Sequence, residues 1–235
     1  MNDKPASTHS QSAPSPGARR RQGGEPAVQG LMIRRAVASD LDRIVEIMHS
    51  EPMPEGVGLA FGDPELARAL GSALIRMPKS PMGWERTVFA VNDDKPAGML
   101  QADASEVTSA SVMKPGVLFR LLRIFGPVKF LRGLPRVRIR ARLNFAYPAG
   151  AYIVHELHVD PAYRNRGIGG ALLDCAEDEA RRLGHARIAL STTTSNPARH
   201  LYERHGFRIA ETKTDPDYER MTGISGRHLM VKELS

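Results

Sequence analysis

Cysteine and aromatic residues are scarce in this sequence: Cys175 is its one cysteine, and Phe, Trp and Tyr make up 6% of its 235 residues. A single cysteine excludes an internal disulfide. No run of about 18 uncharged apolar residues occurs, which argues against a membrane-spanning helix, and the first residues contain no apolar stretch of the signal-peptide kind. These absences together favour a cytoplasmic protein. We expect Cys175, which stands among apolar helical positions, to be a small core residue.

The first thirty residues lack the apolar side chains that fold a chain, since Val28 is their one branched aliphatic residue. Such a segment cannot bury enough surface to offset the loss of chain entropy. We therefore expect residues 1–30 to be a disordered tail. The chain as a whole is 41% apolar, which is ample for a core, and residues 31–235 have a length that suits one domain.

Acidic residues are absent between positions 107 and 155, where nine basic residues stand, from Lys114 to Arg142. The net charge of +7 is therefore the property of one segment. No nucleic-acid-binding motif accompanies this charge, so we expect no nucleic-acid partner. Three roles stay open for the segment: a lid over a substrate pocket, a peripheral surface for acidic lipid or an acidic polypeptide, and a structural elaboration.

The stretch of residues 159–173 (VDPAYRNRGIGGALL) runs from a strand through a basic, glycine-rich turn into an amphipathic helix. Glycines in such a turn leave backbone N–H groups uncovered, and the helix start adds the positive end of its dipole. Arg164 and Arg166 add full charges, so the segment predicts an anion site. A dinucleotide-binding motif would need glycine in place of Leu172, and a P-loop would need Gly-Lys-Ser/Thr, which the sequence lacks.

Two motifs in a fixed order decide which anion site this is. Residues 164–169 (RNRGIG) fit R-x-x-G-x-G, and about thirty residues later residues 196–207 (NPARHLYERHGF) fit N-x-A-x-x-L-Y-x-x-x-G-F. Together they resemble the GNAT superfamily of acyl-CoA-dependent N-acetyltransferases. Residues 32–44 (MIRRAVASDLDRI) are similar to the first strand and helix of that family, so the resemblance covers roughly residues 32 to 234.

The resemblance implies an α/β (α+β) fold, the GNAT fold, in which a twisted mixed β-sheet is flanked by helices. Hydrophobic periodicity and turn signals agree with this arrangement. They predict strands at residues 33–36, 87–91, 97–102, 152–159, 187–191, 207–211 and 228–232. They predict helices capped by Ser39, starting at Asp63-Pro64, and spanning 118–125 and 197–204, together with a helix after the glycine-rich turn that Gly184 can end. Residues of about 107–150 form a basic, partly helical insertion before the strand at 152–159.

Alternation along the strand at 152–159 predicts which side chains share a face. It places His155, Leu157 and Val159 on one face, and Val154, Glu156 and His158 on the other. By resemblance, the pantetheine arm of acetyl-CoA pairs with backbone groups near Leu157 and Val159, in a gap between this strand and the next. The resemblance implies acetyl-CoA as co-substrate and no metal. It gives these cofactor-binding residues: Leu157, His158, Val159, Arg164, Asn165, Arg166, Gly167, Ile168, Gly169, Gly170 and Asn196.

The resemblance also implies the catalytic roles. Tyr202 is the candidate general acid for the departing CoA thiolate, the alternative being an aromatic residue that only packs against the sheet. Glu156 is the candidate base that takes the amine proton, and His158 is a second candidate on the same face. Asn196 either orients cofactor amides or caps the helix that follows it.

The acceptor is expected to be a primary amine, on a small molecule rather than on a protein or peptide. The loop at residues 51–62, the basic insertion and an expected loop at residues 215–219 (DPDYE) could close a pocket, and this acidic loop could attract a cationic amine. A non-catalytic module that binds acyl-CoA and regulates a partner is an alternative of a different class. The sequence leaves the oligomeric state open, and a homodimer is compatible with it.

Overall fold

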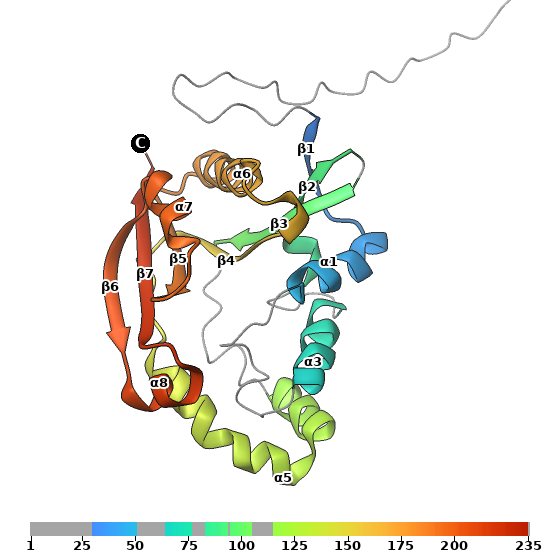
Figure 1. The fold of residues 1–235 in the computed structure, drawn as a ribbon, viewed down its shortest axis with the longest axis vertical. Helices are drawn as coiled ribbons and strands as arrows, with labels where there is room; N and C mark the ends of the chain where they lie inside the picture. Colours follow the sequence, from blue (N-terminus) through green and yellow to red (C-terminus); the bar gives the residue numbers. More distant parts are fainter. Residues whose placement is uncertain (1–29, 51–63, 77–82, 94, 105–114, 235) are drawn as a thin grey trace, which may run out of the picture.

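The computed structural model describes residues 30–50, 64–76, 83–93, 95–104 and 115–234 (Figure 1). The expected tail, up to residue 29, lies outside these ranges. So do the expected loop at 51–62, Asp63 and the start of the basic insertion. Everything that follows concerns the described residues.

Seven strands form one mixed sheet, in the order β1-β2-β3-β4-β5-β7-β6. Neighbouring strands pair antiparallel, except that β4 and β5 pair parallel. Each strand that the sequence predicts is present, and the predicted mixed α/β fold is confirmed. The strands are β1 (Leu31–Arg35), β2 (Thr87–Asn92), β3 (Lys95–Asp103), β4 (Tyr152–Val159), β5 (Arg187–Thr193), β6 (Arg208–Thr214) and β7 (Gly226–Glu233).

Helices cover both faces of the sheet (Figure 1). They are α1 (Leu41–Met48), α3 (Pro64–Arg76), α5 (Pro115–Arg142), α6 (Ile168–Arg182), α7 (Arg199–Arg204) and α8 (Pro216–Thr222). One buried cluster joins the sheet to α6 and α7 and contains Leu172, Ala176 and Tyr202. A second cluster joins β2 and β3 to α1 and α3 and contains Ile44 and Ile75. The sheet therefore has an α6 face and an α1 face.

Two local expectations are wrong. Ser39 does not cap α1, because a 3-10 turn at Ala38–Asp40 precedes the helix and the carboxylate of Asp40 accepts the Val37 N–H at 2.8 Å. The segment 215–219 is not a loop, since α8 begins at Pro216, directly after Asp215. The Asp215 side chain accepts the N–H groups of Asp217 and Tyr218, and Gly223 ends the helix at a φ of 73°.

Helix α5 extends farther than the sequence predicts. The arginines of residues 136–142, which alternate with apolar residues, lie on this helix. Gly126 breaks α5 with a φ of 71° and a ψ of 162°, and Pro127 begins its second part. Within the described residues no helix has the length and apolar character to cross a membrane.

Candidate active site

Strands β4 and β5 separate part-way along their length. They pair at three positions, the last joining Val154 to Leu190, whereas β4 continues to Val159 and β5 to Thr193. Beyond Val154, the edge of β4 that faces β5 therefore has backbone N–H and C=O groups with no strand partner. We name the space between residues 155–159 and residues 191–193 the β4–β5 split. It is the gap that the resemblance implies.

A bulge in β4 changes which of its side chains project to the α1 face of the sheet. Glu156 pairs with Gln101 and Val154 pairs with the next residue, Ala102, so His155 is an extra residue. As a result Val154 and Leu157 both pack in the α6-face cluster, although alternation predicts opposite faces. The predicted grouping of Val154 with Glu156 is wrong. His155 and Glu156 instead both project to the α1 face.

Two polar pairs stand beside the split on this face. The Nε2 atom of His158 lies 2.9 Å from Glu156 Oε2, and both side chains are roughly one-quarter exposed. The Nε2 atom of His155 lies 3.1 Å from Asp103 Oδ1, and Asp103 also forms an ion pair with Arg86. Glu156 and His158 are therefore close enough to exchange a proton, as the two candidate bases.

The turn after β4 is held in place from α1. Arg43 Nη2 donates to Asp160 Oδ2 at 2.7 Å and to the Pro96 carbonyl at 2.8 Å. Asp160 in turn accepts the Ala162 N–H at 3.0 Å, which forms the first bend of the turn. Burial opposes ionisation of Asp160, but the Ala162 N–H and the Arg43 guanidinium hold its pKa below the usual range. Sequence reasoning missed Arg43, because its contact with Asp160 joins residues 117 positions apart.

The turn has the backbone of an anion cradle. Asn165 and Gly167 both take positive φ values, 58° and 75°, and Gly167 directly precedes the first residue of α6. The N–H groups of the first turn of α6 have no partner inside the helix and point out of its end. Arg164 and Arg166 are exposed beside them, and the Arg166 guanidinium stacks 5.4 Å from the Tyr163 ring centroid. These predicted cofactor-binding residues therefore converge next to the β4–β5 split.

Gly169 and Gly170 have a packing role as well. A Cβ atom on Gly169 would lie 2.9 Å from Leu201 Cδ2, and one on Gly170 would lie 3.0 Å from His205 Nε2. Both contacts come from α7 and its C-terminal end. The two glycines therefore allow α6 to approach α7 closely, so their presence alone does not identify a ligand.

Tyr202 lies on α7 with 6% of its surface exposed. Burial, and to a smaller degree the negative charge of Glu156, raises its pKa to about 12. Its ring packs edge-on to Phe207, with centroids 6.1 Å apart. Tyr202 is thus both a packed aromatic residue and a neutral hydroxyl that feels the charge of Glu156 from across the split.

Asn196 uses its side chain within the protein. Its Oδ1 accepts the Ala198 N–H at 2.9 Å, and its Nδ2 donates to Thr192 Oγ1 at 2.8 Å. Both contacts fix the segment between β5 and α7. Helix α7 begins at Arg199 with no side-chain cap, so Asn196 supports the turn before the helix and does not cap it, and its role in holding the cofactor amides stays a prediction.

A model of the acetyltransferase (GNAT) family matches residues 74–207, which is more than half of the chain. The chain belongs to the GNAT acetyltransferase family. Members of this family use acetyl-CoA, and the family that the two motifs predict is confirmed.

Individual relatives are more distant. An uncharacterized N-acetyltransferase from Bacillus subtilis, YhfO, is 42% identical over 57 residues, which are 24% of this chain and 38% of that protein. The match thus spans less than half of the curated relative's length. A Drosophila melanogaster polyamine N-acetyltransferase, described as catalysing the formation of N-acetylagmatine, is 17% identical with a TM-score of 0.53, covering 87% of this chain and 100% of that one. Ard1 from Thermoplasma volcanium is 14% identical with a TM-score of 0.51, covering 88% and 99%. At these identities the solved structures show a GNAT fold and nothing about the acceptor.

The acceptor side of this GNAT domain is less acidic than the sequence suggests. Arg142 Nη1 forms ion pairs with Asp215 at 3.2 Å and Asp217 at 2.9 Å, and Asp215 also caps α8. Their charges are therefore neutralised by contacts within the protein. The expectation that segment 215–219 attracts a cationic amine loses its basis.

A buried cation stands near the split instead. Arg227 is 7% exposed, and its Nη2 donates to Ser191 Oγ at 2.9 Å and to the Ser191 carbonyl at 3.3 Å. Ser191 directly follows Leu190, the last β5 residue paired with β4, and its hydroxyl also contacts the Tyr147 hydroxyl at 3.2 Å. Burial lowers the pKa of Arg227 to about 10, so it stays charged at neutral pH. No sequence motif signals this residue.

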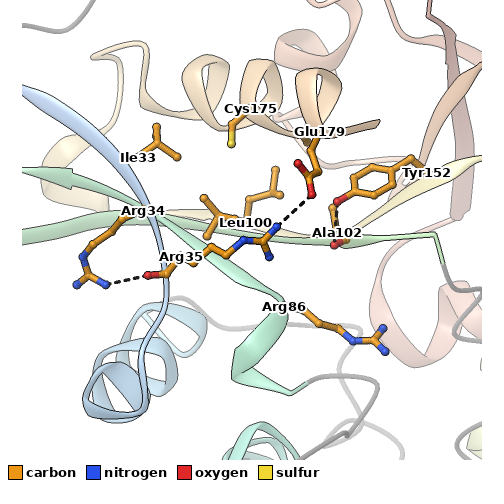
Figure 2. A pocket seen from close by; sticks show the side chains of 11 residues that line it. Ile33, Arg34, Arg35, Arg86, Leu100, Ala102, Tyr152, Cys175 and Glu179 are labelled. Atoms are coloured by element: carbon orange, nitrogen blue, oxygen red, sulfur yellow. Dashed lines mark hydrogen bonds and ion pairs between the residues drawn. The ribbon is translucent and has the colours of Figure 1, made fainter. Parts of the chain in front are cut away.

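A cavity of about 190 Å³ lies under α6, between that helix and β1 to β3 (Figure 2). Its walls include Leu100, Tyr152 and Cys175, and the Arg35–Glu179 ion pair crosses it at 3.1 Å. Cys175 therefore borders a cavity instead of being fully enclosed in the core. Burial raises the pKa of its thiol, which keeps it protonated and a weak nucleophile. The walls of the cavity include no residue of the turn or of the Glu156–His158 pair, so it is separate from the candidate active site.

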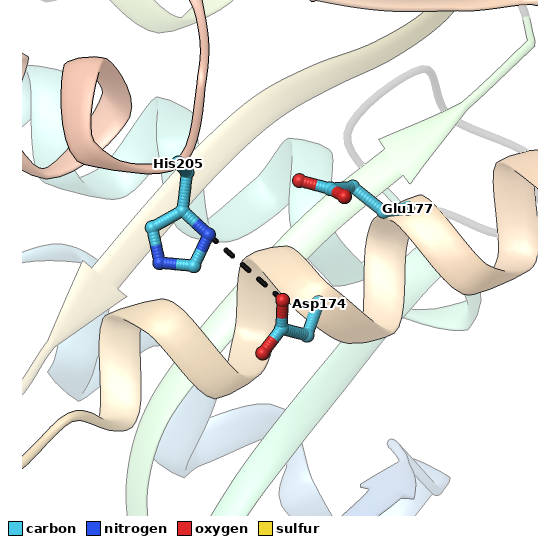
Figure 3. A group of neighbouring side chains, drawn as sticks. All are labelled: Asp174, Glu177 and His205. Carbon is cyan, nitrogen blue, oxygen red and sulfur yellow. Dashed lines mark ion pairs between the residues drawn. The ribbon is translucent and has the colours of Figure 1, made fainter. Parts of the chain in front are cut away.

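Three side chains at the junction of α6 and α7 have the chemistry of metal ligands: Asp174, Glu177 and His205 (Figure 3). The Glu177 carboxylate, however, is fully buried and already neutralised, by Lys232 Nζ at 2.5 Å and Arg181 Nη2 at 3.3 Å. An incoming cation would have to displace the Lys232 ammonium. The cluster therefore ties α6 to β7 and to the end of α7, next to Gly170.

Proposed function

We propose that this GNAT enzyme transfers an acetyl group from acetyl-CoA to a primary amine by direct attack of the amine on the thioester. The observation that carries the proposal is the joint placement of the β4–β5 split and the turn at residues 164–170. A thioester is already activated and an uncharged amine is a competent nucleophile, so positioning is most of the task and can lower the barrier by roughly 7 to 11 kcal/mol. In this proposal the turn binds the CoA pyrophosphate. The backbone groups of Leu157 and Val159, which have no partner in β5, hold the pantetheine arm.

Glu156 is the proposed base. It lies on the α1 face at the bulge, where its carboxylate can take the amine proton directly or through a water molecule. His158, at 2.9 Å, orients the carboxylate and can share the proton. The His155–Asp103 pair stands on the same face, one residue farther from the turn, and is available to position the acceptor.

Tyr202 is the proposed partner of the leaving thiolate. With a pKa of about 12 it is protonated at neutral pH, but full transfer of its proton to a thiolate of pKa about 8.5 would cost roughly 5 kcal/mol. We therefore favour a hydrogen bond from the Tyr202 hydroxyl to the thiolate over complete proton transfer. Once Glu156 takes the amine proton, its charge no longer raises the pKa of Tyr202, so this donor becomes stronger as the reaction proceeds.

The acceptor in this proposal is a small molecule that carries an anionic group as well as the amine. Arg227 supports this, because its buried guanidinium places a positive charge beside the split, and a positive charge there favours an acceptor with an anionic group. An acceptor on a protein or peptide chain is the alternative, and a regulatory acyl-CoA-binding module is a second one.

Release of free CoA thiol from acetyl-CoA is the measurement that separates these functions. The acceptors are amines matched in size, β-alanine against propylamine and 4-aminobutyrate against butylamine, together with peptides that have a free N-terminus or lysine. We expect faster release with the carboxylate-bearing amine of each pair. Preference for peptides would replace the small-molecule acceptor. Tight acetyl-CoA binding without turnover on any amine would leave only the regulatory module.

A further inference from the structure

The exposed side of α5 combines apolar and basic residues. Four of the large apolar side chains that the structure leaves exposed are on this helix: Phe119 at 66%, Leu122 at 39%, Val128 at 59% and Leu131 at 63%. The helix contains no acidic residue. In Figure 1, α5 forms the outer arc at one end of the molecule, away from the sheet. Apolar side chains exposed at such an end leave their surface in water unless something covers it.

The second part of α5 separates the two kinds of side chain by face. Val128, Leu131 and Pro135 follow at spacings of three and four residues, so they form one exposed stripe. Helical geometry places Arg132 and Arg136 on one side of this stripe and Arg138 on the other, all exposed. An apolar stripe with cations on both sides is the arrangement of a helix that lies in a membrane interface.

The opposite face of the same helix packs against the protein. Gly133 is buried, and Leu134 and Val137 are half-buried. The C-terminal end of the helix is fixed as well, because Ile139 packs with the buried cluster around Tyr218 and Arg142 forms ion pairs with Asp215 and Asp217 of the α8 segment. Because the inner face is fixed to the domain, the apolar stripe cannot simply turn inward.

We propose that α5 docks this protein on an anionic membrane surface, with Val128 and Leu131 inserted among the lipid headgroups and the flanking arginines on lipid phosphates. Charge selects this occupant, since an uninterrupted cationic helix matches an anionic bilayer and repels a second copy of itself. Apolar exposure separates it from an acidic polypeptide, which would satisfy the arginines and leave the stripe in water. The described helices cannot span a bilayer, so the contact is peripheral.

Co-sedimentation with vesicles tests the proposal on the full chain, independently of any acetyltransferase activity. One set of vesicles is phosphatidylcholine with about a quarter phosphatidylglycerol, and the other is phosphatidylcholine alone. We expect binding to the anionic vesicles at low salt, and a loss of binding as the Debye length falls from about 10 Å at 0.1 M towards 3 Å at 1 M. Binding at equal strength to both vesicles, or to neither, overturns the proposal.

Two sets of variants identify the surface. Exchanging Val128 and Leu131 for Ser should weaken vesicle binding about 10-fold, because the variant has less apolar side-chain area to bury in the lipid on binding. Exchanging Arg123, Arg132 and Arg138 for Gln should weaken it about 100-fold, since each cation near an anionic surface contributes a factor of about five. Each set has a matched control at exposed positions outside α5, and both controls should bind vesicles as wild type does. The apolar control exchanges Met32 and Val37 for Ser, and the basic control exchanges Arg187, Arg204 and Arg208 for Gln.

Other occupants give different results. If the wild-type protein sediments as a dimer and Leu131→Ser sediments as a monomer, the stripe binds a second copy of the chain and the membrane proposal is refuted. Stronger binding to polyglutamate than to vesicles, unchanged by Leu131→Ser, would assign the arginines to an acidic polypeptide and refute the membrane proposal. Acetyl-CoA titration of each variant checks that the domain is folded, so a loss of vesicle binding is not a loss of structure.

Discussion

Arg43 of α1 and Asp160 of the anion-binding turn form an ion pair at 2.7 Å that joins the two ends of the active site. The same guanidinium holds the Pro96 carbonyl, so β3, α1 and the turn meet at one residue. In our proposal Arg43 does not contact the acyl group, so it is a positioning residue. It fixes the turn that binds the cofactor relative to α1 and β3.

Arg43→Gln should therefore raise the Kd for acetyl-CoA about 2- to 10-fold, the worth of one ordinary hydrogen bond, with a smaller change in kcat. Calorimetric titration measures the first and steady-state kinetics the second. Arg76→Gln, whose partner Asp42 lies on the outer side of α1, is the control. Equal acetyl-CoA affinity in all three proteins would show that the turn holds its shape without Arg43.

The charges of Arg164 and Arg166 give a cleaner test of the turn than its glycines. An aspartate at Gly169 would introduce the Leu201 contact at 2.9 Å as well as a negative charge, so lost binding would have two explanations. Exchanging Arg164 and Arg166 for Gln should weaken acetyl-CoA binding about 10- to 100-fold per residue and reduce its salt dependence. Arg204→Gln with Arg208→Gln, on exposed α7 and β6 positions, should leave both unchanged.

Local signals account for most of what the sequence predicts correctly. The seven strands follow from apolar runs between turn residues, and Gly184 ends α6 with a φ of 81°, as its position suggests. The same signal was available for α8, where Asp215 and Pro216 repeat the Asp-Pro start that predicts α3. The acidic charge of residues 215–219 predicts a loop, whereas the Asp-Pro pair at its start predicts the helix that Asp215 caps.

Tertiary contacts decide what the sequence could not predict. The bulge at His155 arises from its pairing with β3, so period-two alternation fails at that point and the faces of Val154 and Leu157 are assigned wrongly. The neutralisation of Asp215 by Arg142 joins residues 73 positions apart. Arg227 belongs to no motif, and only burial beside Ser191 identifies it as part of the site.

Removing the Tyr202 hydroxyl tests its proposed role. Tyr202→Phe should lower kcat roughly 10- to 1000-fold with little change in acetyl-CoA affinity, because one hydrogen bond to the developing thiolate is lost. Tyr152→Phe is the matched control, since Tyr152 is also buried on the α6 face and its hydroxyl donates to the Ala102 carbonyl at 3.3 Å. If chemistry limits turnover and both variants turn over like wild type, Tyr202 only packs.

Glu156 and His158 can be separated by the pH dependence of kcat/KM. Glu156→Gln removes the proposed base, so the rate should fall and the acid limb of the profile should change shape. His158→Gln keeps the carboxylate and should lower the rate less. Glu203→Gln, on a half-buried α7 position, serves as the control. An unaltered profile in Glu156→Gln, with an altered one in His158→Gln, would transfer the role of base to His158.

Asp40 predicts how stability depends on pH. Its bond to Arg34 at 2.7 Å, against the opposing effect of burial, lowers the pKa of Asp40 in the folded state. A carboxyl group whose folded pKa is depressed stabilises the protein above its unfolded pKa of about 3.9, and this contribution is lost as the pH falls through the folded pKa. Asp40→Asn should therefore lower the free energy of unfolding by about 1 to 3 kcal/mol at pH 7.

The same difference should shrink as the pH falls below about 4, the unfolded pKa, and should reach its minimum below the folded pKa, where wild-type Asp40 is neutral like the asparagine. Urea unfolding at a series of pH values measures it. Asp42→Asn is the adjacent control, since the Asp42 side chain is 88% exposed and its ion pair with Arg76 is screened by water. A constant difference between wild type and Asp40→Asn down to pH values below the folded pKa would mean that Asp40 stabilises the β1–α1 connection through packing and not through its charge.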